Sequence, residues 1–137
     1  TILFKDDEVA MNDIQKPCDN EEDFNNRIQA LSTLLDKMET GALKKHVNLD
    51  LVGSVSILEG FLNKKFPGYS IKIISNFRNI IILRSKKHPI HPDDPGFIRA
   101  LGYFGFRYPP DDWERLWKVV LDKYLESLEL LFKCLNE

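Results

Sequence analysis

The sequence predicts an all-α protein, a helical bundle of about five helices with a long C-terminal helix. Apolar residues recur at spacings of three and four along most of the chain, the period of amphipathic helices. No Asn-Gly or Asp-Gly pair is present, so the strongest short signal for a β-hairpin is missing. The length of 137 residues suits one domain with its own apolar core. We therefore expect a single helical domain over residues 21–137.

The composition limits the classes of partner. A content of 43% hydrophobic and 29% charged residues is typical of a globular domain, and a net charge of -2 gives no global attraction to nucleic acid or to an anionic membrane. No apolar run approaches the roughly 20 residues of a membrane span. Cys18 and Cys134 have neither disulfide-framework nor metal-ligand spacing, which favours a reduced, cytoplasmic protein without a cofactor. Because the chain begins with Thr1 rather than Met, we expect it to be the C-terminal part of a longer protein.

Residues 1–20 are predicted to be a poorly ordered acidic lead-in or linker, because polar residues dominate and few apolar positions repeat. Asn20 and the acids at 21–23 then form the start of a helix, with an N-cap and negative charge in the first turn. Gly41 is its expected end. Its apolar stripe consists of Phe24, Ile28, Leu31, Leu35 and Met38.

A second helix is expected after Asn48 or Asp50, either of which can serve as its N-cap. Pro67 and Gly68 should end it. Its apolar face consists of Leu51, Val55, Leu58 and Leu62, widened by Ile57 and Phe61.

The segment 69–85 permits two interpretations. Ile71, Ile74, Phe77 and Ile81 fit a helical face. The isoleucines are also β-branched and fit a hairpin around residues 76–79. We favour the helix, because an isolated two-stranded hairpin would be poorly supported among helices.

After three prolines between residues 86 and 95, a short helix is expected from about Gly96 to Gly102. An aromatic run from Tyr103 to Tyr108 follows, interleaved with Arg107. Such a run can stack nucleic acid bases, but packing of the loop onto the bundle is the favoured interpretation.

The C-terminal helix has the clearest start in the chain, with Asp111 as N-cap and Glu114 three residues later. Trp113 and Trp117 lie one turn apart and suit core anchors or a partner-binding ridge. The apolar stripe, which runs on to Leu135, is wider than a surface helix needs. We therefore expect this helix either to be the spine of the bundle or to pack on a second subunit in a homodimer.

Charge is uneven along the chain. Between Asp6 and Asp23 there are eight acidic residues and one lysine, whereas residues 60–92 contain seven Lys/Arg and no acid. A solvated basic face is the simpler interpretation. The alternative is that this segment binds phosphate or RNA through Arg78, Lys86 and Lys87.

Chemistry concentrates in the segment 84–94, for which three hypotheses stand. Its histidines and the acids Asp93 and Asp94 are suitable metal ligands, but adjacent lysines oppose a cation, and we predict no metal site. Arg84 can hold phosphate while His91, supported by His88, moves a proton during RNA cleavage. In the third hypothesis the histidines cap a helix and Arg84 pairs with an acid.

Arg84 and His91 have six residues between them, and residues 76–80 precede Arg84 as the end of a core helix would. This arrangement resembles the motif of the HEPN superfamily. Domains of that family are all-helical, and two copies face each other to form a ribonuclease site from such an Arg and His. The resemblance covers residues 50–135 in helix order. Pro89 and Pro92 depart from the pattern and put a shared face for Arg84 and His91 in doubt.

Many HEPN domains act without catalysis, and the resemblance therefore implies two functions. The favoured one is a non-catalytic helical module for assembly or recognition within a larger protein. The alternative is a metal-independent endoribonuclease whose Arg84 and His91 form a site at a dimer interface.

Overall fold

The computed structural model describes residues 15–36, 53–84 and 94–136, and within these ranges every regular element is an α-helix. The all-α prediction is confirmed, including the long C-terminal helix. The helices, in chain order, are α2 (Glu21–Asp36), α3 (Ser54–Lys65), α4 (Pro67–Leu83), α5 (Pro95–Tyr103) and α6 (Trp113–Leu135). No helix among the described residues is long and apolar enough to cross a membrane.

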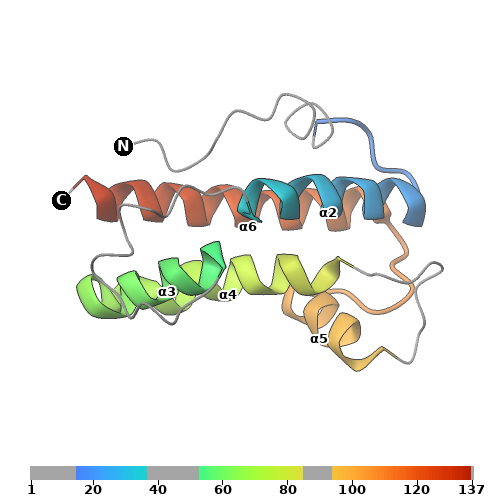
Figure 1. Cartoon of the computed structure of the whole chain (residues 1–137). Coiled ribbons are helices and arrows are strands. Elements are labelled where there is room, and N and C mark those ends of the chain that lie inside the picture. Colours follow the sequence, from blue (N-terminus) through green and yellow to red (C-terminus); the bar gives the residue numbers. More distant parts are fainter. Residues whose placement is uncertain (1–14, 37–52, 85–93, 137) are drawn as a thin grey trace.

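The bundle has two layers, with α2 beside α6 in one and α3 beside α4 in the other (Figure 1). α5 packs near the end of α4. α4 contacts all four other helices, whereas α6 contacts α4 and α2. The expectation that the last helix is the spine was therefore wrong. α4 is the central helix, because it packs on α3 in its own layer and on α2 and α6 in the other.

Of the segment 69–85, residues 69–83 are helical, as predicted, and Pro67 occupies the first turn of α4, where its missing N–H costs no hydrogen bond. Its buried face differs from the predicted stripe. Ile73, Phe77 and Ile80 are fully buried, whereas Ile71 is 80% exposed. Burial of the large side chains outweighs the slightly unfavourable helix propensity of β-branched residues, which is a few tenths of a kcal/mol per residue.

α3 and α4 are separated by Phe66 alone, so the chain reverses at the predicted Pro67 with no loop. The N-cap of α3 is Gly53, whose φ of 91° places it in the left-handed region that favours glycine. The proposed caps Asn48 and Asp50 lie outside the described residues, as do Met38 and Gly41 of the first predicted helix.

α2 begins as predicted, with the Asp23 N–H donating to Asn20 Oδ1 at 2.8 Å. Of the predicted lead-in, the structure describes residues 15–20. Cys18 is buried there, and the Pro17 carbonyl accepts a hydrogen bond from Arg27 Nη2 at 3.2 Å. This short segment therefore packs against α2 and belongs to the domain.

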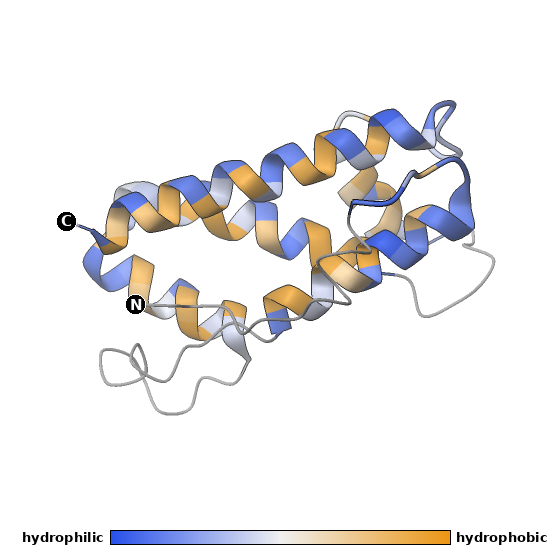
Figure 2. Ribbon diagram, turned by 90° about the horizontal axis from the view of Figure 1, so that it is seen from above, coloured by the Kyte–Doolittle hydropathy of each residue, from blue (hydrophilic) through white to orange (hydrophobic). Residues whose placement is uncertain are grey.

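The N-cap of α6 is Asp112, not the predicted Asp111: Asp112 Oδ1 accepts from the Arg115 N–H at 3.0 Å. The sequence offers two adjacent acids as caps. In the first turns that follow, the Trp113 ring packs 5.5 Å from that of Phe24, with Trp117 one turn later against the same ring. Apolar and hydrophilic bands alternate along the helices (Figure 2), as expected for amphipathic elements around one core.

The cap assignment is testable by substitution. Asp112→Ala should lower the free energy of unfolding by about 1 kcal/mol, because an orphan N–H of the first turn loses its acceptor. Asp111→Ala, the matched control one residue earlier, should change it by less than about 0.5 kcal/mol. Urea denaturation followed by circular dichroism measures both. A larger loss in the Asp111 variant would show that the cap lies one residue earlier.

Candidate functional site

Of the six residues predicted to carry the site, the structure describes Arg78 and Arg84. His88, His91, Lys86 and Lys87 lie outside the described residues, as does Asp93. Asp94, considered as a metal ligand, caps α5 instead: its Oδ1 accepts from the N–H groups of Gly96 and Phe97. Within the described ranges, no group of three His, Cys, Asp or Glu side chains is placed to hold a metal ion.

Arg84 directly follows α4 and reaches across to the end of α2. Its Nη1 lies 3.3 Å from Asp36 Oδ2, and its side chain is 36% exposed. The guanidinium therefore pairs with an acid, Asp36, as the third hypothesis expected. An exposed ion pair of this kind contributes at most about 1 kcal/mol to stability, so another anion could displace Asp36 from Arg84.

Arg78 lies six residues earlier and points to a different helix. Its Nη2 lies 2.8 Å from Glu59 Oε1 and 3.3 Å from Ser56 Oγ, both on α3. With 3.6 residues per turn, positions 78 and 84 face different sides of α4. The two predicted cations are thus directed to α3 and α2, and they do not converge within the described part of the chain.

The aromatic run packs mainly as the favoured interpretation expected. Phe104 and Phe106 are buried, and the Tyr108 hydroxyl donates to Glu21 Oε1 at 3.2 Å. These contacts tie the loop between α5 and α6 to the start of α2. The rings of Phe104 and Phe106 therefore contribute to the core and are not free for base stacking.

Tyr103, the last residue of α5, belongs to a polar network that reaches into the bundle between α4 and α6. Its hydroxyl donates to Oδ1 of the buried Asn76, whose Nδ2 donates to Ser127 Oγ at 2.7 Å and to the Lys123 carbonyl at 3.2 Å. One amide thus connects α4 to α5 and α6. Buried polar groups are costly unless they are paired, and all three side chains here have partners.

The thiol of Cys18 is not activated. Burial, with the nearby Asp23 carboxylate, raises its pKa to about 12. Since the thiolate is the reactive form, Cys18 stays protonated at neutral pH and is inert as a nucleophile. Burial likewise raises the pKa of Tyr124 to about 12, which keeps this phenol neutral.

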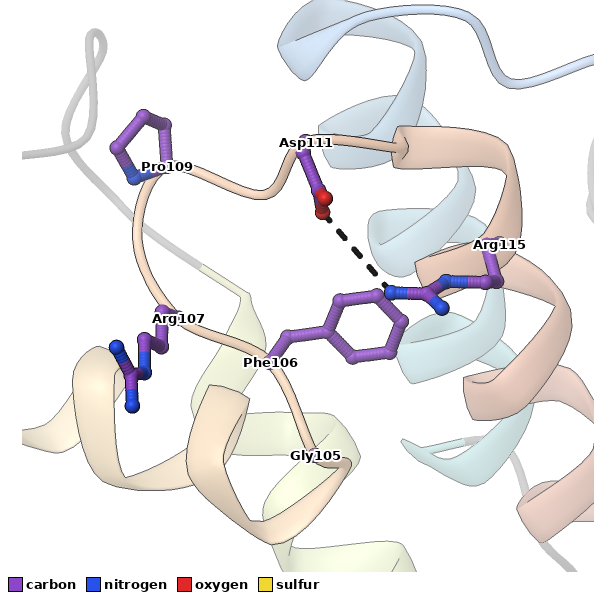
Figure 3. Close-up of a pocket in the computed structure, with 6 residues that line it drawn as sticks. All are labelled: Gly105, Phe106, Arg107, Pro109, Asp111 and Arg115. Atoms are coloured by element: carbon purple, nitrogen blue, oxygen red, sulfur yellow. Dashed lines mark ion pairs between the residues drawn. The ribbon is translucent and has the colours of Figure 1, made fainter.

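One pocket, with a volume of about 320 Å³, lies between the α5–α6 loop and the first turn of α6 (Figure 3). The Arg115 guanidinium lies 4.9 Å above the centre of the Phe106 ring. Its Nη2 is 3.9 Å from Asp111 Oδ1, and both of these charged side chains are largely exposed. The lining is completed by Gly105, Arg107 and Pro109.

Sequence reasoning noticed Arg107 among the aromatic residues but missed this pocket. Arg115 comes from the helix after the loop, and only the i,i+4 spacing from Asp111 hinted that the two side chains meet. The pocket uses arginines outside the basic segment 60–92, which is where the charge pattern directed attention.

Comparison of the chain with protein-family models, with curated protein sequences and with solved structures gave no match.

The Asn76 network yields a stability prediction. Asn76→Ala should lower the free energy of unfolding by about 2 kcal/mol, because the amide is lost and buried Ser127 loses its nearest partner. Asn79→Ala on the same helix is the matched control, since within the described ranges the Asn79 side chain bonds the Ser75 carbonyl one turn away and no other group. It should cost about 0.5 kcal/mol or less. Chemical denaturation of the two variants decides the matter, and equal losses would contradict a special role for Asn76.

Proposed function

We propose that this domain is a non-catalytic, HEPN-like assembly module that joins a second copy of itself through α6. The observation that carries the proposal is a pair of large apolar side chains on the solvent side of that helix. Leu125 is 47% exposed and Phe132 is 44% exposed. Single exposed apolar residues need no explanation, but an aligned set is typical of an interaction surface.

The exposed pair belongs to a longer row. Leu121 and Leu128, each partly buried, complete a ridge at positions 121, 125, 128 and 132. The intervals of four, three and four are those of a heptad seam, at which side chains of two helices interlock. We call these four residues the α6 ridge. It is distinct from the core face of α6, where Val120, Tyr124 and Leu131 are buried.

A second copy suits the α6 ridge because the same apolar row on both subunits is self-complementary, as a two-fold interface requires. Exposed charges of both signs lie beside the ridge: Lys118, Asp122, Glu129 and Lys133. Mixed charges around an apolar centre form the usual rim of a protein interface. They favour a partner with the same mixed charges over a polyanion.

The remaining support is architectural. A helix that ends beside Arg84 and a long final helix follow the order expected from the HEPN resemblance, in which two copies associate. The proposal includes a reducing, cytoplasmic compartment, and Cys18 and Cys134 are both buried.

A metal-independent endoribonuclease is the second candidate, favoured by the exposed position of Arg84 at the end of α4. Phosphate would have to displace Asp36, a weak competitor because the ion pair is exposed. His91 would act as the acid or base, with His88 in support.

Self-association can be tested by replacing apolar residues of the α6 ridge with charged ones. The double variant Leu125→Asp/Phe132→Asp should weaken dimerisation at least about 100-fold, because two anchors are replaced by charges that resist desolvation. Ile71→Asp, at the exposed apolar residue of α4, is the matched control and should leave it unchanged. Sedimentation equilibrium from 1 to 200 μM provides the measurement. A wild-type chain that stays monomeric throughout would refute the module as proposed.

RNA cleavage separates the two candidates. If the chain is a module, the wild type and His91→Ala should both leave a fluorescently labelled single-stranded RNA intact in EDTA. For a nuclease, cleavage should occur and fall about 100-fold or more in His91→Ala, the scale of lost acid–base catalysis. Arg84→Gln should reduce it too, while Arg99→Gln, an exposed arginine on α5, serves as the control. Reproducible His91-dependent cleavage would overturn the non-catalytic proposal.

A further inference from the structure

We infer that the pocket at the start of α6 binds a small carboxylic acid with an apolar body. This inference is independent of the proposed assembly through the α6 ridge. The volume of about 320 Å³ is at the lower end of the range for small-molecule sites. The ligand is thus limited to a small acid or to the last residue of a peptide.

The pocket holds cations whose hydrogen-bonding groups are still available. Arg107 is exposed and makes no hydrogen bond or ion pair with the rest of the described chain. Among the same described residues, the side chain of Arg115 has the long contact of 3.9 Å to Asp111 and the cation–π contact with Phe106. Arg78 and Arg84, in contrast, lie within 3.3 Å of acids. Arg107 and Arg115 are therefore more available to an external anion than Arg78 and Arg84 are.

Stacking on Phe106 orients the Arg115 guanidinium. The ring of Phe106 is itself buried, so it is a fixed support. Figure 3 shows Asp111 facing the edge of Arg115, with Arg107 on the other side of Phe106. A guanidinium with one face on a ring still presents its N–H edge, which matches a carboxylate in two parallel hydrogen bonds. The ligand carboxylate would take the place of Asp111 at this edge.

The net charge of the pocket favours a carboxylate over a phosphate as its ligand. Arg107 and Arg115 against Asp111 give the lining a net charge of +1, which one carboxylate neutralises. A phosphate monoester carries about -1.5 to -2 at pH 7. Asp112 and Glu114 lie just beyond the lining and would repel the additional charge. Pro109 and the edge of Phe106 give the ligand body an apolar wall.

The test uses N-acetyl-phenylalanine as the probe, titrated into the ¹⁵N-labelled chain and followed by amide chemical shifts. Shifts should concentrate at residues 105–107 and 111–115, and the neutral N-acetyl-phenylalaninamide should not produce them. Arg115→Gln should weaken binding at least about tenfold and Arg107→Gln a few-fold, whereas Arg99→Gln should have no effect. Asp111→Asn should tighten binding about two- to fivefold, because the competing carboxylate is removed.

The same titration distinguishes the source of the carboxylate. Tighter binding of a tripeptide ending in phenylalanine than of the free acid would assign the pocket to a peptide C-terminus, and the reverse would assign it to a small acid. Equal binding of the acid and the amide would overturn the inference. So would tighter binding of phenyl phosphate, or a loss in Arg99→Gln as large as that in Arg115→Gln.

Discussion

The burial of α4 against four other helices is the constraint on which the rest of the structure depends. Apolar contacts alone do not fix the rotation or axial position of a helix, because neighbouring registers bury similar area. The amide of Asn76 supplies that specificity, since it bonds α6 through Ser127 and α5 through Tyr103 in one arrangement. Arg78 and Arg84 add exposed ion pairs to α3 and α2. Each neighbour of α4 is thus attached through its own polar contact.

Sequence patterns predicted the helices well, because the periodicity that defines a helix is local. Sequence patterns predicted less well the features that depend on contacts between residues distant in the sequence. The N-cap of α6 is Asp112 and not its neighbour Asp111, a choice between adjacent acids that local sequence leaves open. The fold class and the order of the helices were therefore accessible from sequence, whereas the central role of α4 was not. The number of contacts a helix makes is a property of the tertiary arrangement.

The candidate site shows the same limit. A run of basic residues in the sequence indicates positive charge. Whether those side chains can bind an external anion depends on which acids the fold brings near them. The fold places Asp36 beside Arg84 and Glu59 beside Arg78. Both acids are distant from their arginines in the sequence, so the charge pattern did not predict these ion pairs. Arg115 follows three acids, Asp111, Asp112 and Glu114, and Arg107 lies outside the basic segment 60–92. In the fold, the Asp111 carboxylate lies 3.9 Å from the Arg115 guanidinium, whereas Asp112 bonds the Arg115 backbone N–H.

The two proposed surfaces of α6 are compatible with each other. Arg115 precedes Leu121, the first residue of the α6 ridge, by six residues, which at 1.5 Å per residue is about 9 Å along the helix axis. The pocket lies beside the first turn, and the α6 ridge occupies the following turns. A partner docked on the ridge would therefore leave the pocket open, and both copies in a two-fold dimer would retain a site. Because the charge of the pocket does not contribute to the apolar ridge, ligand binding and self-association should vary independently when either surface is substituted.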